Sequence, residues 1–170
     1  MDEKEYLEVT AAHTFCKAYS GMYRVPASFE HLNMPRKPDV TVSIDGEEQD
    51  LEIAHLYSNE EEAKQLKSLV DPSLPDNTLL SIRSMVPLTP LQSNLLDALS
   101  DLLNKKSTKY YRSQNPWLVI RNASPKWQRR DFEVAISKLK VPKIHPFHEI
   151  WLIPDLVGKQ GLIRLYPKSG

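Results

Sequence analysis

The stretch KPDVTVSIDGEEQDLEIAHLYSN, residues 37–59, decides the fold, because the hydrophobic residues within it recur at every second position. From Val40 to Ile44 hydrophobic and polar side chains alternate, which predicts a β-strand with one buried face. The DGEE segment at 45–48 is typical of a tight turn. A second alternating run at 49–57 then predicts the other strand of a β-hairpin.

The rest of the chain alternates between helical and strand-like patterns. We expect helices over about residues 2–20, 58–70, 89–111 and 124–140, and further strands within 76–85, 115–122, 146–155 and 161–167. Residues 20–38 carry one glycine and three prolines, and they predict a loop with at most one extra turn. This order predicts one α/β (α+β mixed) domain over residues 1–170, in which helices flank a central mixed sheet of about five to six strands.

Composition limits the classes of function. The chain has 170 residues, of which 41% are hydrophobic and 26% charged, as in an ordinary globular domain. Its net charge of zero weighs against a nucleic-acid enzyme, because such proteins usually carry a basic face. Cys16 is the single cysteine, so the chain has no internal disulfide and no cysteine-rich zinc site.

The cellular location is predicted from absent targeting signals. The first residues, MDEKEYLEV, are acidic and lack the hydrophobic run of a signal peptide. No stretch of the sequence approaches the length of a membrane-spanning helix. We therefore expect a cytoplasmic protein that does not bind membranes.

Two carboxylates of the hairpin are the candidate functional residues. The alternation puts Asp39 and Glu52 on one face of facing strands, and His55 on the other face, where a packed histidine is expected. Two close carboxylates resist joint ionisation unless a cation lies between them, so Mg²⁺ is a natural ligand. The alternative is an ordinary charged hairpin face on an α/β protein with no metal chemistry.

The quoted stretch resembles the core of the PD-(D/E)XK nuclease superfamily, in which a Pro-Asp strand precedes a hairpin and a Glu-bearing strand. The segments NPWLVIRNASPKWQRRDFEVAISKLK and PFHEIWLIPD, followed by GLIRLYP, are similar to the closing elements of that superfamily. The resemblance implies a restriction-endonuclease-like fold. It also implies a Mg²⁺- or Mn²⁺-dependent endonuclease that hydrolyses nucleic acid, DNA above all, through a metal-bound water.

The resemblance also implies the roles of individual residues. Asp39 and Glu52 would be catalytic metal ligands, and Glu8, on the first helix, is the best match for a third acidic ligand. The departure is Ala54, which stands where the family carries the lysine that activates the attacking water.

In some family members the following helix supplies the missing group. Gln65 and Lys67 are therefore the candidate substitutes for the lysine missing at Ala54. If neither substitutes, we expect a non-catalytic nuclease-fold module that binds a protein or another partner.

Overall fold

A mixed β-sheet forms the centre of the protein, for which the computed structural model describes residues 1–33, 38–73 and 94–168. The sheet of this described part has six strands, in the order β1-β2-β3-β4-β5-β6. These strands are β1 (Ala27–Leu32), β2 (Val40–Ile44), β3 (Glu47–Leu56), β4 (Trp117–Asn122), β5 (Glu149–Ile153) and β6 (Ile163–Tyr166). The helices described are α1 (Glu3–Tyr23), α2 (Glu60–Leu69), α4 (Leu95–Ser107) and α5 (Arg129–Ile136).

Both parallel and antiparallel pairs occur in the sheet. Strands β1, β2 and β3 are antiparallel neighbours, β3, β4 and β5 are parallel, and β6 returns antiparallel to β5. The predicted α/β class is confirmed, with a mixed sheet flanked by helices.

The hairpin that decides the fold is formed by β2 and β3. Asp45 and Gly46 make its turn with positive φ angles of 52° and 84°, which the Asp-Gly pair tolerates well. Val40 and Val42 are fully buried, as the alternation predicts. Asn59 caps α2 by accepting a hydrogen bond from the Glu62 amide.

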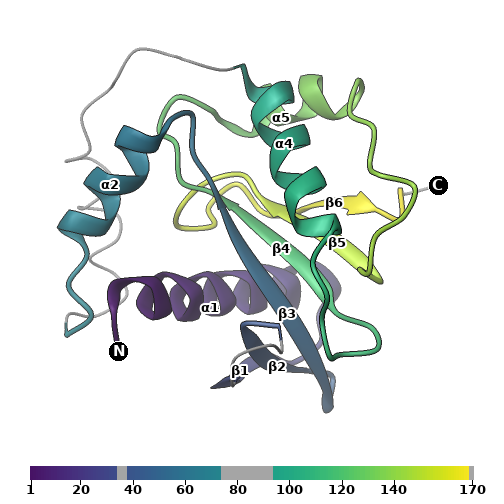
Figure 1. Ribbon diagram of the computed structural model, residues 1–170. Coiled ribbons are helices and arrows are strands. Elements are labelled where there is room, and N and C mark those ends of the chain that lie inside the picture. Colours follow the sequence, from purple (N-terminus) through teal and green to yellow (C-terminus); the bar gives the residue numbers. More distant parts are fainter. Residues whose placement is uncertain (34–37, 74–93, 169–170) are drawn as a thin grey trace.

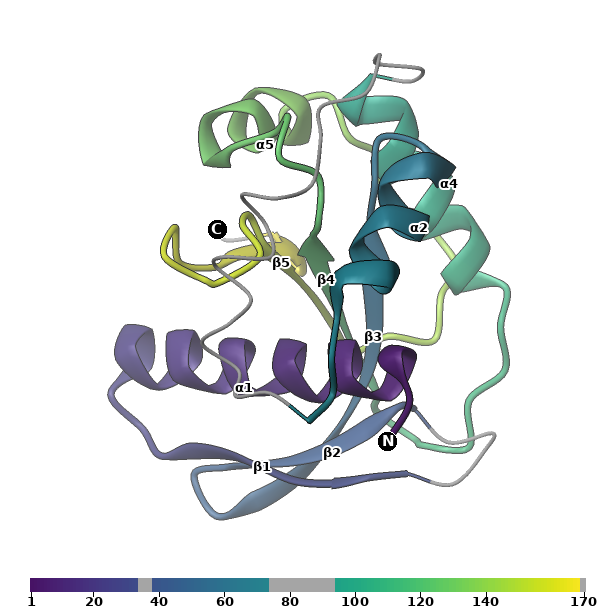
Figure 2. The same cartoon turned by 90° about the vertical axis from the view of Figure 1, so that its left-hand side faces the viewer.

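Helices cover the sheet in layers (Figure 1). Helix α1 packs on one face, where Ala11 and Phe15 meet Val40, Val42 and the other buried side chains of that cluster. Helices α4 and α5 pack on the opposite face, and α2 lies over the first turns of α1, as the rotated view shows (Figure 2). Strand β4, predicted within residues 115–122, is buried at all six positions because it lies inside the sheet with helices on both faces.

Three predicted elements differ in the structure, the first being the helix expected over 124–140, which is shorter and spans Arg129–Ile136. The expected loop at 20–38 is wrong in part, because residues 27–32 form β1, an edge strand that pairs with β2. The helix expected from residue 89 begins only at Leu95, behind the N-cap Asn94, and it ends at Ser107. The strand predicted within 76–85 lies outside the described residues.

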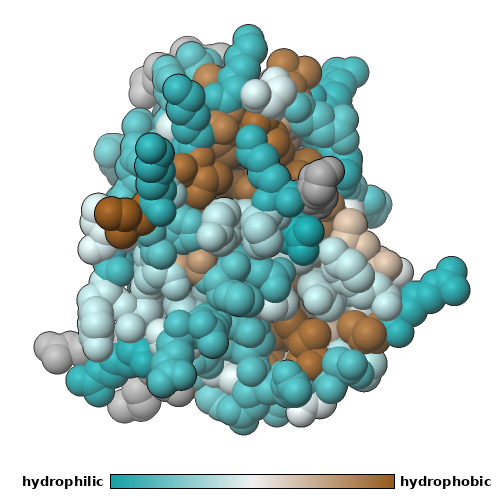
Figure 3. Space-filling model, turned by 90° about the vertical axis from the view of Figure 1, so that its right-hand side faces the viewer, coloured by the Kyte–Doolittle hydropathy of each residue, from teal (hydrophilic) through white to brown (hydrophobic). Residues whose placement is uncertain are grey.

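One face of the molecule is hollowed by a hydrophobic groove (Figure 3). Between α4 and α5 a cavity of about 490 Å³ is lined by Leu95, Trp127, Val134 and neighbouring residues. Over the parts of the chain that the structure describes, none of the helices has the length and hydrophobicity needed to cross a membrane.

Candidate active site

Strand β3 changes partners halfway along its length, and the candidate site lies at this point. Residues 47–51 of β3 pair with β2, whereas residues 51–56 pair with β4. The last pair with β2 joins Val40 to Leu51. One step further in the same register, Asp39 comes opposite Glu52, which explains why two residues 13 positions apart meet here.

The Asp39 carboxylate closes the end of the β2–β3 ladder. Its Oδ2 accepts a hydrogen bond from the backbone N–H of Ile53 at 2.9 Å. Asn33 fixes the backbone before it, because its side-chain amide donates to the Pro38 carbonyl at 2.7 Å and its own N–H donates to the Asp39 carbonyl at 3.0 Å. The position of Asp39 is therefore set by β1 and β3 together.

The electrostatic environment of Asp39 is unfavourable for a negative charge. Burial, followed by the charges of the Glu52 and Glu8 carboxylates, raises the pKa of Asp39 to about 7. A hydrogen bond between the Asp39 and Glu52 carboxyl groups acts in the same direction, whereas the Ile53 N–H opposes the shift. The two acids are therefore close enough to share a proton, or a cation in its place.

Glu52 is buried and has two partners besides Asp39. Its Oε2 accepts hydrogen bonds from Lys106 Nζ and from the Tyr111 hydroxyl, both at 3.0 Å. The Lys106 ion pair is shielded from solvent, since the side chains of Lys106 and Glu52 are 16% and 6% exposed. Helix α4 thus delivers an ammonium group to the acid of β3.

Glu8, on α1, is the third acid near Asp39 and Glu52. It is buried, and its pKa is raised, mainly by burial and also by the charge of Glu52. Its one ion pair among the described residues is with Lys4, at 3.6 Å. The turn of α1 that carries Glu8 is tied to the sheet by Arg121, which donates to the Leu7 carbonyl at 2.9 Å and to Thr10 Oγ1 at 3.0 Å.

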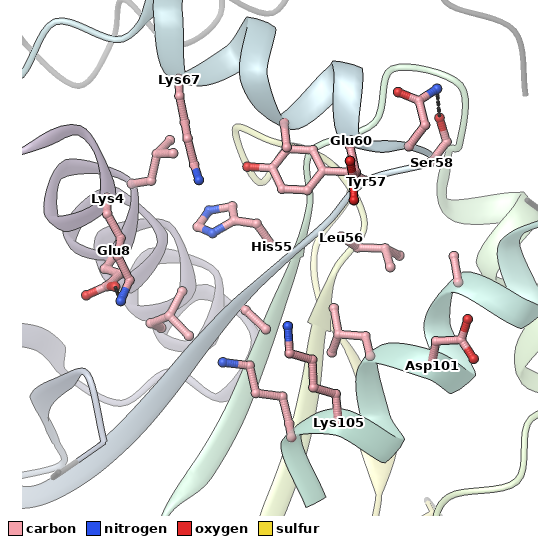
Figure 4. Close-up of a pocket in the computed structure, with 18 residues that line it drawn as sticks. Lys4, Glu8, His55, Leu56, Tyr57, Ser58, Glu60, Lys67, Asp101 and Lys105 are labelled. Carbon is pink, nitrogen blue, oxygen red and sulfur yellow. Dashed lines mark hydrogen bonds and ion pairs between the residues drawn. The ribbon is translucent and has the colours of Figure 1, made fainter. Parts of the chain in front are cut away.

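The residues proposed as substitutes for the missing lysine lie differently. Ala54 is on the same face of β3 as Glu52 and belongs to the core cluster below α4. Gln65 donates to Glu61 at 3.2 Å and is not among the residues that line the pocket. Lys67 does line the pocket, and its ammonium group points toward His55 (Figure 4).

His55 lies on the face opposite Glu52, as the alternation predicts. Its Nε2 accepts a hydrogen bond from Arg121 Nε at 3.0 Å, so the neutral ring carries its hydrogen on Nδ1. Burial, followed by the charges of Arg121, Lys67 and Lys106, holds the pKa of His55 well below its usual value. His55 is therefore packed, and it also borders a cavity.

A cavity of about 620 Å³ opens beside these residues (Figure 4). Its floor is residues 53–59, and its walls come from α1, α2 and α4. Glu8, Lys67, Lys105 and Lys106 are among its lining residues. Glu8 and these lysines therefore share one accessible space, whereas Asp39 and Glu52 are not among the residues that line it.

Two residues of the site were not predicted from the sequence, namely Lys106 and Tyr111. The pair Lys105-Lys106 at a helix C-terminus is sufficiently explained by the helix dipole, so nothing in the local sequence points to Glu52. Helical spacing could have found the contact only if the packing of α4 against β3 had been known.

The chemistry of this site is that of oxygen ligands and amines. Within residues 1–33, 38–73 and 94–168, no three His, Cys, Asp or Glu side chains are grouped so as to hold a metal ion by themselves.

Comparison with protein-family models, with curated proteins and with solved structures found no match for this chain. The function is therefore argued from the geometry of the site.

Proposed function

We propose that this protein is a Mg²⁺- or Mn²⁺-dependent endonuclease with a restriction-endonuclease-like fold that hydrolyses nucleic-acid phosphodiesters, with DNA as the first substrate to test. The observation that carries the proposal is the meeting of Asp39 and Glu52 halfway along β3, with Lys106 bonded to Glu52. Lys106 then takes the place of the lysine that is missing at Ala54, in preference to Gln65 or Lys67.

The donor set fits a hard divalent cation. Mg²⁺ is commonly held by one or two carboxylates, with water and substrate phosphate completing its coordination. Asp39 and Glu52 would be these two ligands, and Glu8 would add negative charge beside them. The raised pKa of Asp39 supports this assignment, because a site that favours a proton between two acids also favours a cation there.

Lys106 and Tyr111 would assist the metal in two different ways. A bound Mg²⁺ would supply polarisation of a phosphoryl oxygen and a lower pKa for the attacking water. Lys106 lines the cavity while it contacts Glu52, so its ammonium group can donate a hydrogen bond to the water or to the phosphate. The Tyr111 hydroxyl holds the Glu52 carboxylate in position.

The same ion pair supports a second candidate function, a non-catalytic module of this fold. Lys106 already brings one positive charge to Glu52, and an ammonium group can take the role that a metal has in an active nuclease. In that case the cavity would serve a binding partner, and Lys106 would compete with added metal.

One set of variants separates the two functions. We expect wild type to bind Mg²⁺ or Mn²⁺ in calorimetry and to nick supercoiled DNA. Asp39→Asn should lose both properties, whereas Lys106→Met should retain metal binding and lose about 100-fold or more in cleavage rate. Lys64→Met, which removes an exposed lysine of α2 outside the cavity lining, is the matched control and should behave like wild type.

Two results would contradict the nuclease. The first is the absence of both metal binding and cleavage of DNA and RNA in wild type. The second is metal binding that appears only after Lys106→Met, since this would identify Lys106 as the permanent replacement for the ion.

A further inference from the structure

The last turn of α4 and the loop that follows it combine positive charge with an exposed aromatic side chain. This basic segment, residues 105–112 with the sequence KKSTKYYR, carries four positive charges and no acid, in a chain whose net charge is zero. It leads from the end of α4 toward β4 (Figure 1). Its residues Lys105, Lys109, Tyr110 and Arg112 are exposed. The neutrality of the whole chain therefore does not extend to this segment.

Two side chains fix the basic segment to the candidate site. Lys106 Nζ and the Tyr111 hydroxyl both donate to Glu52 Oε2, each at 3.0 Å. The Lys109 N–H donates to the Lys106 carbonyl at 3.3 Å. The Tyr111 ring also packs on Phe147, with 5.4 Å between the ring centroids. The residues between positions 106 and 111 are therefore held beside Glu52 from both ends.

Tyr110 is the exposed aromatic residue of the basic segment. Its neighbour Tyr111 is buried, whereas Tyr110 is 83% exposed. In the part of the chain that the structure describes, no other aromatic ring packs against Tyr110. An aromatic side chain of this kind can stack on any nucleobase, because every base has a π-face.

Lys109 and Arg112 place positive charge on either side of Tyr110. Neither of them forms an ion pair within residues 1–33, 38–73 and 94–168. The charge of Lys106, followed by burial, lowers the pKa of Lys109, and the charge of Glu52 acts in the opposite direction, so Lys109 lies near both. An anion beside Lys109 would reduce the repulsion between the two ammonium groups.

We propose that the basic segment binds a single strand of nucleic acid, with Tyr110 stacked on a base and with Lys109 and Arg112 in contact with neighbouring phosphates. A single strand fits because the bases of a duplex are stacked on one another and offer no face to Tyr110. Since the segment is tied to Glu52, the bound strand would pass beside the acid pair. The inference deepens the proposed function, on which it rests for the cleavage that follows binding.

The first test separates base stacking from phosphate contacts. The probe is a labelled thymidine oligonucleotide of about eight nucleotides, and binding is followed by fluorescence anisotropy with a chelator at low, constant ionic strength. We expect saturable binding to wild type, and about tenfold weaker binding of an abasic strand of the same length. Tyr110→Ala should lose about tenfold in affinity for the thymidine strand and stay within about twofold for the abasic strand, whereas Tyr110→Trp should bind both strands like wild type.

The second test concerns the phosphate contacts. Lys109→Ala/Arg112→Ala should weaken binding of both strands about tenfold, because the two strands share the phosphates. The matched control is Lys17→Ala/Lys64→Ala, which removes the same charge from exposed positions of α1 and α2 and should stay within about twofold of wild type. Equal weakening in the two double variants, or equal affinity of wild type for the thymidine and abasic strands, would overturn the proposal.

Asp39→Asn separates this inference from the nuclease function. It should retain strand binding, because Asp39 lies outside the basic segment, while it loses metal binding and cleavage. Strand binding by a wild type that binds no Mg²⁺ would contradict the nuclease and support the binding surface. If Tyr110→Ala bound and cleaved the thymidine strand like wild type, the binding surface would be overturned and the nuclease would be retained.

Discussion

Lys106 Nζ lies 3.0 Å from Glu52 Oε2, although 54 positions separate the two residues in the chain. The contact joins α4 to β3 two positions before Ala54, where the nuclease family that the sequence resembles carries its lysine. A charged group can therefore reach the same acid from another element of the fold.

The first prediction concerns a variant in which the lysine is moved from position 106 to position 54. If Lys106 supplies the activity, Lys106→Met should reduce cleavage, and adding Ala54→Lys should restore about tenfold or more of it. The reason is that Ala54 and Lys106 line the same cavity, so an ammonium group from either position can reach the site. The measurement is the initial rate of nicking of supercoiled DNA at saturating Mg²⁺.

The control for this relocation is Lys106→Met with Ala54→Met, which adds a side chain of similar length without charge. Equal activity of the two double variants would show that bulk at position 54, and not charge, accounts for any recovery.

The second prediction concerns the pH dependence of stability. The pKa of Asp39 is about 7 in the folded protein and 3.8 as an ordinary aspartate, so between these values the folded state holds more protons than the unfolded state. The free energy of unfolding should therefore fall as the pH rises through this window and stay low above it. Asp39→Asn should remove a drop on the order of 1–3 kcal/mol.

This drop is measured by urea denaturation without metal at about pH 5 and about pH 8. Asp101→Asn, an exposed acid of α4, serves as the control and should leave the drop unchanged. A drop of equal size in wild type and Asp39→Asn would assign the pH dependence to other groups.

The third prediction concerns Arg121, which is completely buried and joins three parts of the fold. It donates to His55, to the Leu156 carbonyl at 3.3 Å and to α1 through Leu7. Arg121→Met leaves these acceptors buried without their donor, so we expect a loss of about 2–4 kcal/mol in the free energy of unfolding. Arg112→Met, at an exposed position, should change it by less than about 0.5 kcal/mol in the same denaturation series.

The fourth prediction concerns Glu62, whose side chain is fully buried at the start of α2. It accepts hydrogen bonds from the Ser58 N–H at 2.7 Å and from the Ser124 hydroxyl at 3.1 Å, and it lies 3.7 Å from Lys126 Nζ. Glu62→Gln should lower the free energy of unfolding by about 1–3 kcal/mol, because the charge opposite Lys126 is lost.

Thermal or urea denaturation checks the effect against Glu61→Gln, which changes the neighbouring exposed acid. If both variants lose the same stability, the network around Glu62 contributes nothing beyond helix-end electrostatics.

The sequence predicts the strands whose burial pattern is strong. Alternation from Val40 to Ile44 and the Asp-Gly turn were sufficient for the hairpin, and the hydrophobic run that forms β4 was sufficient to predict a strand there. Strand β1 was missed because its residues are at most half-buried and follow Pro26, so its pairing with β2 leaves little hydrophobic signal.

The candidate site was predictable only where the pairing is local. Asp39 and Glu52 belong to one hairpin, so their meeting follows from the turn and the register. Lys106 comes from a distant helix, and only the packing of α4 on the sheet brings it to Glu52. Gln65 and Lys67 were inferred from the resemblance, which implies that the helix after β3 can supply the missing group, yet Gln65 bonds to Glu61 within its own helix.

The change of partner along β3 has a consequence for how the protein opens. Asp39 sits on the β1–β2 side of the change, whereas Glu52 and Lys106 belong to the core strand and to α4. An ion bound by both acids would therefore link strands β1 and β2 to strand β3 and the rest of the sheet. Amide hydrogens of β1 and β2 should then exchange more slowly when the metal is bound, while those of β4 keep their rate.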